Sequence, residues 1–512
     1  MKKFIISFTM ILLAILTLTS CGNNVTKHII FDENSESLKI TRGGEYVLSG
    51  KLINGKIEVD AKKEVRLILS GLTVENSKEE ALEIDNKSKT TIVTEKGTKN
   101  YLTGADEAAI SSNSEIEFCG EGELAITGTD KHAIECEGNI TINGGKYEIN
   151  AYEHGIKSES IIKILLGDIS VVSETGKGIK AEKEYIGDGG NITIYTKLDE
   201  GLESKGALTI NGGNYDITAY DDAINAGTSD SNKTEEEKAF EEFSKDFGGK
   251  TPVHPEGFNE DAPIPNDRFN GEVPTPPEGF KGEFTPGNKP GRNNGDGFEV
   301  PPTDFTVPEG ATVSGRGVPF SHEGKPGFGK INSDSVITIN GGTIKIKTFG
   351  EGDGIDSNGS LSINGGTVII DGPKQYDNGS LDSDGEMIIN NASVLTVSSK
   401  GMTQYPGSMT QHKLIVDFDE VLEEGTVIII KDEEQNIIIE HAVGVICERL
   451  YYTSPEVKEN AVYTVFVNDE EVTSVTSDNS ENFGDFGNFG GRGPKAEGGF
   501  APFEQKDANK EN

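Results

Sequence analysis

The 512-residue sequence contains no tryptophan, five methionines and four cysteines. Three of the cysteines, Cys119, Cys136 and Cys447, show no close pair spacing, which argues against a disulfide framework, and we expect them to be small buried residues. Basic residues are also few: 47 Lys and Arg stand against 86 Asp and Glu, a formal net charge of -39. This balance disfavours binding to nucleic acid or anionic lipid. It suits a cation-binding protein, or simply a highly soluble one.

Long apolar runs are absent except in the first residues. Residues 1–21, MKKFIISFTMILLAILTLTSC, have two lysines, an apolar run and small or polar residues before Cys21, which predicts a signal peptide. The ending LTSC resembles a bacterial lipobox, which implies cleavage before Cys21 and lipidation of that cysteine. An ordinary signal peptide with a chance cysteine is the alternative. We therefore expect an exported bacterial protein, anchored to the cell surface or membrane by a lipid at Cys21.

Glycine is abundant, with 64 residues, and it marks a repeat. Each unit reads as strand, Asn-Gly-Gly turn and strand, as in TINGGKYEIN (141–150) and TINGGNYDIT (209–218). An aliphatic anchor recurs every 22–24 residues from Ile110 to Ile224. Leucine-rich repeats need a different pattern, and a propeller blade needs about 40 residues. The period therefore predicts an all-β parallel β-helix. The predicted anchors are Leu82, Ile110, Ile134, Ile156, Ile179, Leu202, Ile224, Ile355, Leu381 and Met402.

Composition divides the chain into further segments. The stretch between the two repeat regions is rich in Pro, Gly and Phe, and its low apolar content predicts disorder. In the alternative, its phenylalanines dock on the β-helix or on a partner. The predicted segments are a signal peptide (1–21), a β-rich cap of irregular first coils (25–80), the β-helix (81–227 and 331–411), a disordered insertion (228–330), a small β domain (412–476) and a disordered tail (477–512).

Several motifs occur in a recognisable order: NGGNYDITAYDDAINAG, a long insertion, GEGDGIDSNGSLSINGG, DNGSLDSDGE and SSKGMTQ. They resemble a bacterial family of exported carbohydrate-binding domain-containing proteins, over roughly residues 28–470. The resemblance implies a right-handed parallel β-helix, shared with pectate lyases, that binds calcium, cellulose and acidic pectic polymers. The family's acidic pair is missing before Ile134, Ile156 and Ile179. We therefore expect a calcium row only on the later coils.

The acidic pair Asp221–Asp222 precedes the anchor Ile224. Two adjacent carboxylates, with others one coil away, offer the oxygen ligands that calcium takes, whereas without a cation these like charges raise each other's pKa. A solvated corner with water and sodium is the alternative. The sequence has no EF-hand loop and no Cys/His cluster for zinc. The candidate calcium ligands are Asp199, Glu200, Glu203, Asp221, Asp222, Asn225, Asp353, Asp356, Asp382 and Asp384.

Arginine is absent from residues 81–227 and 330–411, so the coils offer no arginine base for a polysaccharide lyase. Lys180 or Lys205 would need a depressed pKa to act as base, which the surrounding negative charge opposes. We expect a non-catalytic protein that binds acidic polysaccharide such as polygalacturonate, or cellulose, although the lack of tryptophan disfavours a flat crystalline-cellulose platform. A calcium-dependent lyase with a lysine base and a structural or adhesive surface protein are the alternatives.

Few side chains are candidates for contact with a sugar. The candidate carbohydrate contacts are Tyr152, Tyr220 and Lys205. Tyr147 and Tyr215 share a repeat position with isoleucines, so we expect them in the core. His132 and His154 stand at the same place in two successive repeats. We interpret them as ordinary corner residues, with a sugar contact or a pH-sensitive ligand as the alternative.

Overall fold

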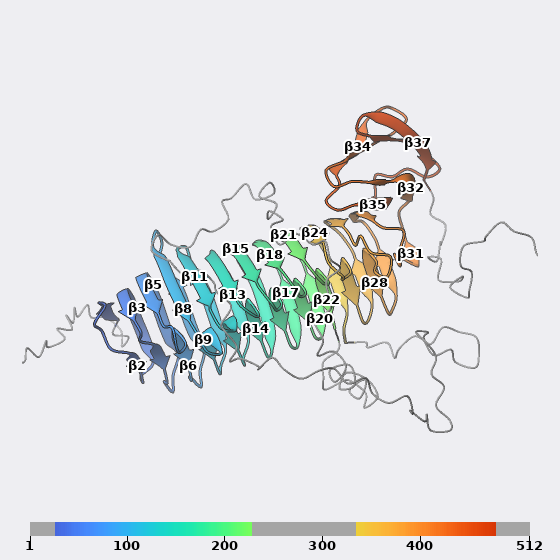
Figure 1. Cartoon of the computed structure of the whole chain (residues 1–512). Coiled ribbons are helices and arrows are strands. Elements are labelled where there is room, and N and C mark those ends of the chain that lie inside the picture. The colour runs from blue at the N-terminus through green and yellow to red at the C-terminus, as the bar shows by residue number, and fades with distance from the viewer. Residues whose placement is uncertain (1–25, 228–333, 478–512) are drawn as a thin grey trace, which may run out of the picture. The chain divides into compact units, whose positions relative to one another are not determined.

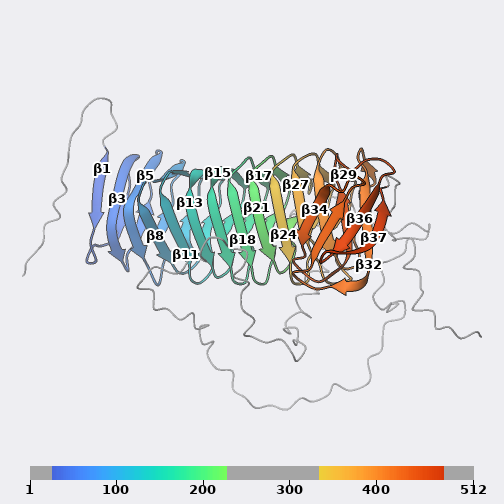
Figure 2. The same cartoon turned by 90° about the horizontal axis from the view of Figure 1, so that it is seen from above.

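The chain folds into stacked β coils (Figures 1 and 2). The computed structural model describes residues 26–227 and 334–477, and every regular element in these ranges is a strand. The strands of the coils pair in parallel with the coils before and after them, which confirms the predicted all-β parallel β-helix. No helix in the described ranges is long and apolar enough to cross a membrane. The predicted signal peptide (1–21), the predicted insertion (228–330) and the tail beyond residue 477 lie outside the described residues.

Each coil passes once through a sheet of eleven short strands, sheet B. In the three-residue strands of this sheet other than β19, the central residue is at least partly exposed and the residues on either side are largely buried, as in Ile179–Ala181. The strands of sheet B are β2 (Leu38–Ile40), β4 (Ile57–Val59), β6 (Leu82–Ile84), β9 (Ala108–Ser112), β12 (His132–Cys136), β14 (Ile156–Ser158), β16 (Ile179–Ala181), β19 (Leu202–Ser204), β22 (Ile224–Ala226), β25 (Ile355–Ser357) and β28 (Leu381–Ser383).

The rest of each coil crosses a 22-stranded sheet, sheet A, on both sides of the Asn-Gly-Gly corner. Four strands, such as β13, run through this corner without a break. The strands of sheet A are β1 (Lys27–Phe31), β3 (Gly44–Ile53), β5 (Val65–Glu75), β7 (Thr90–Thr94), β8 (Lys99–Gly104), β10 (Ile116–Gly120), β11 (Glu123–Gly128), β13 (Ile140–Ala151), β15 (Ile161–Ser173), β17 (Glu184–Gly187), β18 (Asn191–Thr196), β20 (Ala207–Ile210), β21 (Asn214–Ala219), β23 (Ile337–Ile339), β24 (Thr343–Thr348), β26 (Leu361–Ile363), β27 (Thr367–Asp371), β29 (Met387–Ile389), β30 (Ser393–Ser398), β31 (Ser408–Met409), β32 (Lys413–Leu422) and β35 (Cys447–Thr453).

One continuous core runs inside the coils from Phe31 to Val394. It forms because aliphatic residues alternate with polar ones at the strand period, so that each coil places its Ile, Leu and Val side chains above those of the coil before. Tyr147 and Tyr215 are 1% and 2% exposed, which confirms their predicted place in the core. Cys136 and Cys447 are buried as predicted. The prediction for Cys119 is wrong, because its side chain lies on the half-exposed outer side of β10.

The glycine corner brings successive backbones close together. Gly213 has a φ of 99°, and a Cβ at this position would lie 2.9 Å from the carbonyl oxygen of Gly190 in the preceding coil. Only glycine fits such a conformation and such a contact. Beside this corner, asparagine amides hydrogen-bond from coil to coil: Asn340 Nδ2 donates to Asn211 Oδ1 at 2.9 Å, and Asn364 Nδ2 donates to Asn340 Oδ1 at 3.1 Å.

The coils on either side of the predicted insertion are direct neighbours. Ile224 in β22 pairs in register with Ile355 in β25, and Leu208 in β20 pairs with Ile337 in β23. The hydroxyl of Ser335, fully buried, donates to the carbonyl of Gly227 at 2.6 Å. The described residues on the two sides of the predicted insertion therefore meet within one coil.

The C-terminal residues continue sheet A and then form a separate small sheet. Strand β35 pairs antiparallel with β30 and with β32, so parallel pairing ends at β30 on this side of the corner, while β31 still pairs in parallel with β29 on the other side. Beyond it lies sheet C, built from β33 (Val427–Lys431), β34 (Ile437–Ala442), β36 (Val462–Val467) and β37 (Glu470–Thr476). The predicted anchor Met402 is wrong: it is 39% exposed and outside any strand, because sheet B already ends at β28 and the chain turns toward this C-terminal part.

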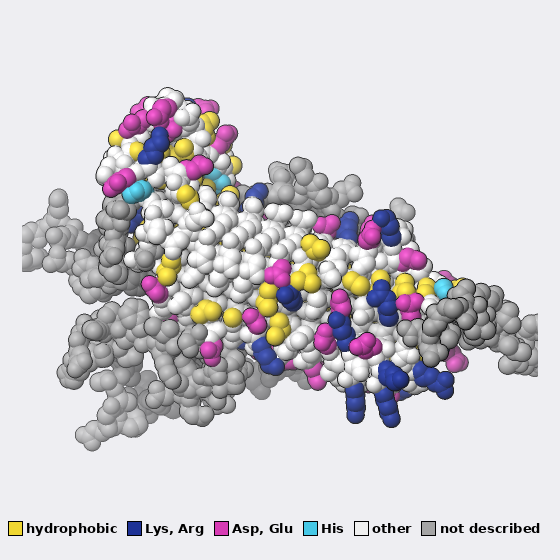
Figure 3. All heavy atoms as spheres, turned by 180° about the vertical axis from the view of Figure 1, so that it is seen from behind, with side chains coloured by type: hydrophobic (Ala, Val, Ile, Leu, Met, Phe, Trp, Pro, Cys, Tyr) yellow, Lys and Arg dark blue, Asp and Glu magenta, His cyan; other side chains and the backbone are white. Residues whose placement is uncertain are grey.

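Charged side chains of opposite sign are interleaved over the N-terminal coils on the face shown in Figure 3. Many of them form ion pairs between neighbouring coils, such as Lys89 Nζ–Glu117 Oε2 at 2.6 Å and Lys131 Nζ–Glu107 Oε2 at 2.6 Å. Such exposed pairs contribute little energy each, at most ~1 kcal/mol. In the later coils, by contrast, several acidic side chains lie together without such partners.

Candidate functional site

Two columns of side chains flank the anchors of sheet B. We call the residue two before each anchor the corner position and the residue one after it the central position. Because the anchors pair in register, residues in one column lie one coil apart, about 4.8 Å. The corner positions are His132, His154, Lys177, Glu200, Asp222, Asp353 and Gly379, and the central positions are Glu135, Lys157, Lys180, Glu203, Asn225, Asp356 and Asp382.

The predicted ligands fall on these columns or directly beside them, and they form two groups. Three carboxylates of one group, Asp199, Glu200 and Asp221, each place an oxygen within 4.8 Å of the others, and three of the next group, Asp353, Asp356 and Asp382, do the same. We call the residues of the first group, with Glu203, the first acidic cluster. The second acidic cluster consists of Asp222, Asn225, Asp353, Asp356, Asp382 and Asp384.

Backbone amides orient the carboxylates of the second acidic cluster. Asp222 Oδ1 accepts the backbone N–H of Asp353 at 2.7 Å, and its Oδ2 accepts Asn225 Nδ2 at 2.7 Å. Asp353 in turn accepts the N–H of Gly379 at 2.6 Å, and Asp382 accepts the N–H of Ser383 at 2.9 Å. The bonds from the N–H groups of Asp353 and Gly379 link one coil to the next, whereas the bonds from Asn225 and Ser383 lie within one coil.

Burial and mutual repulsion raise the pKa values in the second acidic cluster. Burial is the larger cause, with neighbouring carboxylates adding to it, and the pKa rises to about 8 for Asp353 and Asp356 and to about 6 for Asp382. Among the described residues, no lysine, arginine or histidine forms an ion pair with these three aspartates. Like charges held this close to each other favour either a proton or a cation between them.

The donor chemistry of the second acidic cluster fits calcium. Asn225 Oδ1 is buried and accepts no hydrogen bond, and it lies in the central column directly before Asp356. Calcium takes six to eight oxygen ligands, from carboxylates, amide carbonyls and water. A buried amide oxygen without a partner beside several carboxylates is such a set.

The first acidic cluster already contains a cation, the ammonium of Lys177. Lys177 Nζ lies 3.1 Å from Asp199 Oδ1 and 3.4 Å from Glu203 Oε2, and it also donates to Glu200. Glu203 is fully buried and additionally pairs with Lys205. Burial raises the pKa of Asp199, while Lys177 opposes this rise. Asp221 forms no ion pair with another described residue, and its pKa rises to about 6 through burial and the charge of Asp222.

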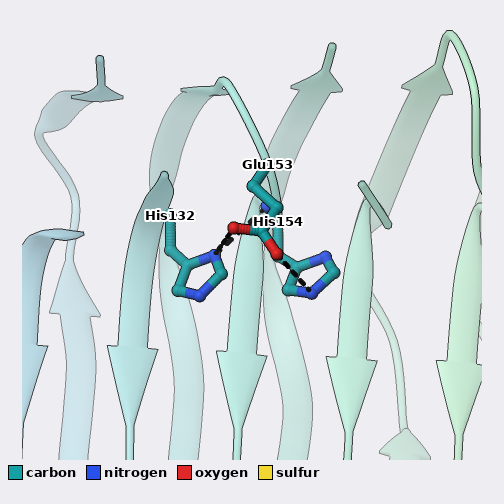
Figure 4. A group of neighbouring side chains, drawn as sticks. All are labelled: His132, Glu153 and His154. Carbon is teal, nitrogen blue, oxygen red and sulfur yellow. Dashed lines mark hydrogen bonds and ion pairs between the residues drawn. The ribbon is translucent and has the colours of Figure 1, made fainter. Parts of the chain in front are cut away.

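His132 and His154 stack on neighbouring coils, with the Glu153 carboxylate between them (Figure 4). Their ring centroids are 4.8 Å apart and nearly parallel, at 8°. His132 Nδ1 accepts the backbone N–H of His154 at 3.3 Å, and His154 Nδ1 accepts that of Lys177 at 2.9 Å. Because both Nδ1 atoms are acceptors, both rings are neutral with the proton on Nε2. Burial is the main reason that the pKa of each ring is lowered, for His154 to about 2.

Aromatic side chains lie beside the acidic clusters. Tyr152 is 46% exposed. Tyr220 is half-buried and packs edge-on against Phe349, with ring centroids 5.7 Å apart, and Phe349 stacks on Tyr195 at 6.2 Å. Lys205, the third predicted sugar contact, pairs with Glu203. Cys21 lies outside the described residues.

Sequence reasoning missed the ammonium of Lys177 and the ring of Phe349. The signal for Lys177 was its place at the corner position, directly before the coil that carries Glu200. Phe349 gave no local signal, because 128 residues lie between it and Tyr220 in the sequence.

Comparison with known proteins adds a family likeness to this geometry. Residues 34–197 match the sequence model of a family described as carbohydrate-binding domain-containing proteins, which confirms the resemblance over that segment. A protein of this description from Acetivibrio thermocellus is 27% identical over 189 residues, which cover 29% of this chain and 65% of the relative's length. A solved structure of a polysaccharide lyase-like protein from C. thermocellum, a gadolinium derivative, is 25% identical, covers 40% of this chain and 92% of its own, and has a TM-score of 0.35.

Proposed function

We propose that this protein is a non-catalytic carbohydrate-binding β-helix whose second acidic cluster holds calcium and binds acidic polysaccharide of the polygalacturonate type, with cellulose as a further ligand. The observation that carries the proposal is the group Asp353, Asp356 and Asp382, together with the buried, unpartnered oxygen of Asn225. The match to carbohydrate-binding domain-containing proteins supports the class of ligand. Bound calcium supplies the positive charge that lets a uronate carboxylate approach an acidic protein surface.

The protein's own residues perform the remaining tasks of binding. Backbone N–H groups of Asp353 and Gly379 hold two of the carboxylates in place, so the oxygens are ordered before a ligand arrives. Tyr220, half-buried against Phe349, offers part of its ring to a sugar, and Tyr152 offers a more exposed ring farther along the coils. Lys205, at the edge of the first acidic cluster, adds an ammonium for a sugar carboxylate or hydroxyl.

The positions of the lysines favour a binding protein over a lyase. Lys180 Nζ lies 2.5 Å from Glu182 Oε1, and Lys205 pairs with the buried Glu203. A base must offer a lone pair to the substrate proton, and both nitrogens are already engaged by carboxylates. We also propose that the protein is exported and tethered by a lipid on Cys21. Labelling with radioactive palmitate checks this tether, and Cys21→Ala should abolish the label.

The test of the proposed function is calorimetry of residues 22–512 with polygalacturonate, in calcium and in chelator. We expect binding in calcium only. The double variant Asp353→Asn/Asp356→Asn should weaken binding at least about tenfold, equivalent to ~1.4 kcal/mol, while it keeps the shape of both side chains. The matched control is Asp168→Asn, which removes an exposed carboxylate at the glycine corner, where Asp168 accepts Asn191 Nδ2 at 2.7 Å. This control should bind like the original protein.

Three results would contradict the proposal in different ways. Equal binding in chelator would remove the role of calcium. Absence of binding to polygalacturonate and to cellulose, with retained adhesion to cells or proteins, would favour a structural or adhesive role. The absorbance of an unsaturated sugar product would reveal a lyase.

A further inference from the structure

Both columns beside sheet B change from basic to acidic between the coil of Lys177 and Lys180 and the next coil. The corner column passes from His154 to Lys177 and then to Glu200, and the central column passes from Lys180 to Glu203. Lys177 is therefore the last basic side chain of the corner column before the carboxylates begin. Its three ion-pair partners in the next coil are Asp199, Glu200 and Glu203.

The ammonium of Lys177 sits among three carboxylates of that next coil. Its nitrogen lies 3.1 Å from Asp199 Oδ1 and 3.4 Å from Glu203 Oε2, and it contacts Glu200 more closely still. Among the described residues, no other ion-paired lysine has more than two carboxylate partners; Lys157, for example, pairs with Glu135 and Glu159. The Lys177 side chain is 13% exposed, so solvent screens these contacts only partly.

Glu203 shows that this cluster is built around a positive charge. Its side chain is 1% exposed. Two ammonium groups, those of Lys177 and Lys205, lie against its two carboxylate oxygens. Burial of a carboxylate costs much free energy unless a cation pairs with it.

We propose that Lys177 is a built-in cation, whose ammonium occupies the place that a calcium ion would otherwise take between Asp199, Glu200 and Glu203. The first acidic cluster is then closed to calcium, and the ion-binding capacity of the corner is confined to the second acidic cluster. The first cluster has four carboxylates and two ammonium groups, those of Lys177 and Lys205, whereas the second has five carboxylates and, among the described residues, no ion-paired lysine. The part of this inference that concerns the second cluster rests on the proposed function.

A tethered ammonium and a free ion differ in their response to the medium. A chelator removes calcium but leaves Lys177 in place, so the coils around Leu202 keep their shape without calcium. The second acidic cluster loses its cation under the same conditions. Lys177 thereby sets how many ions the corner binds.

The experiment separates the two clusters by combining variants. Asp353→Asn/Asp356→Asn disables the second cluster, and Lys177→Ala is added to this background. Calorimetry with calcium chloride should show no bound ion in the background variant and one bound ion per chain after the loss of Lys177. Lys177→Arg should bind none, because it keeps a cation. The matched control Lys197→Ala, which breaks a more exposed pair with Glu174 at 2.5 Å, should also bind none.

Thermal unfolding gives an independent measurement on the same proteins. Lys177→Ala should melt at a lower temperature in chelator and recover in calcium, whereas the melting temperature of Lys197→Ala should be unchanged by calcium in this background. Lys177→Ala that binds no calcium, or that folds neither with calcium nor without it, would overturn the inference. Lack of calcium binding by the original protein, with one ion bound by Lys177→Ala in the background, would sink the proposed function and leave the inference standing.

Discussion

The buried pair His132 and His154 makes the early coils sensitive to acid. Replacing His154 by asparagine removes its titration but keeps an acceptor for the backbone N–H of Lys177, which His154 Nδ1 accepts at 2.9 Å. The carboxylates of Asp222 and Asp353 accept the corresponding N–H groups at the same position of later coils. A short side chain with a terminal oxygen therefore suits this place.

The expected magnitude follows from the pKa of His154, which burial lowers to about 2, against about 6.5 in the unfolded chain. A histidine whose folded pKa is lowered contributes stability above the unfolded pKa, and this stability is lost as the pH falls below it. At pH 4.5 the unfolded state has gained a proton at His154 that the folded state cannot accept. The loss relative to pH 7 is about 2.7 kcal/mol, at ~1.36 kcal/mol per pH unit.

The assay is urea denaturation at pH 7 and at pH 4.5, followed by tyrosine fluorescence, since the chain has no tryptophan. Buried aspartates such as Asp356 have raised pKa values and shift stability in the opposite direction, but they are present in both proteins and cancel in the difference. His154→Asn should lose about 2.7 kcal/mol less than the original protein between these pH values. An equal loss in both proteins would refute the reasoning.

Three further predictions follow from the fold and the clusters. Deleting residues 228–333 should leave a folded stack with a melting temperature within a few degrees of the original, measured by circular dichroism, because the coils on either side are in register; loss of the β signal would contradict this. Gly213→Ala should destabilise the chain by more than about 1 kcal/mol in urea denaturation. Gly97→Ala, also at positive φ but with open space around its Cβ, should cost less, and equal effects would argue against the close contact. Calcium binding at pH 7 should release protons, because the pKa values of Asp353 and Asp356 are about 8; a calorimetric enthalpy independent of the buffer would disprove this.

The parallel stack was predictable because its signal repeats. From Ile110 to Ile224 an anchor recurs every 22–24 residues, and each anchor buries an aliphatic side chain at the same register position. The first coils gave no such signal. Leu38, Ile57 and Leu82 pair in sheet B, but 19 and then 25 residues separate them. Residues 25–80 therefore read as an irregular cap, although they contribute β1 to β5 to the two sheets.

The acidic positions could be predicted from the sequence, but not which of them pair with a lysine and which do not. In a coil-by-coil count of carboxylates, Lys177 appears only as a residue in a coil that lacks the acidic pair. Its side chain reaches the carboxylates of the following coil, and such a contact belongs to the stacking of coils, which a one-dimensional pattern does not contain. The ring of Phe349 was hidden for the same reason, since its contact with Tyr220 joins coils on opposite sides of the predicted insertion.

The antiparallel strand β35 has a consequence for how the molecule ends. A parallel stack presents at its last coil the same row of N–H and C=O groups with which every earlier coil recruited its successor, and this row is a template for another chain. By placing β35 in reverse direction on β30, with Val394 opposite Thr453 and Ser398 opposite Arg449, the protein uses up that template with its own backbone. The strand acts as a cap on β30: the strand that follows β30 at this edge runs in the opposite direction, so no further parallel coil adds to β30.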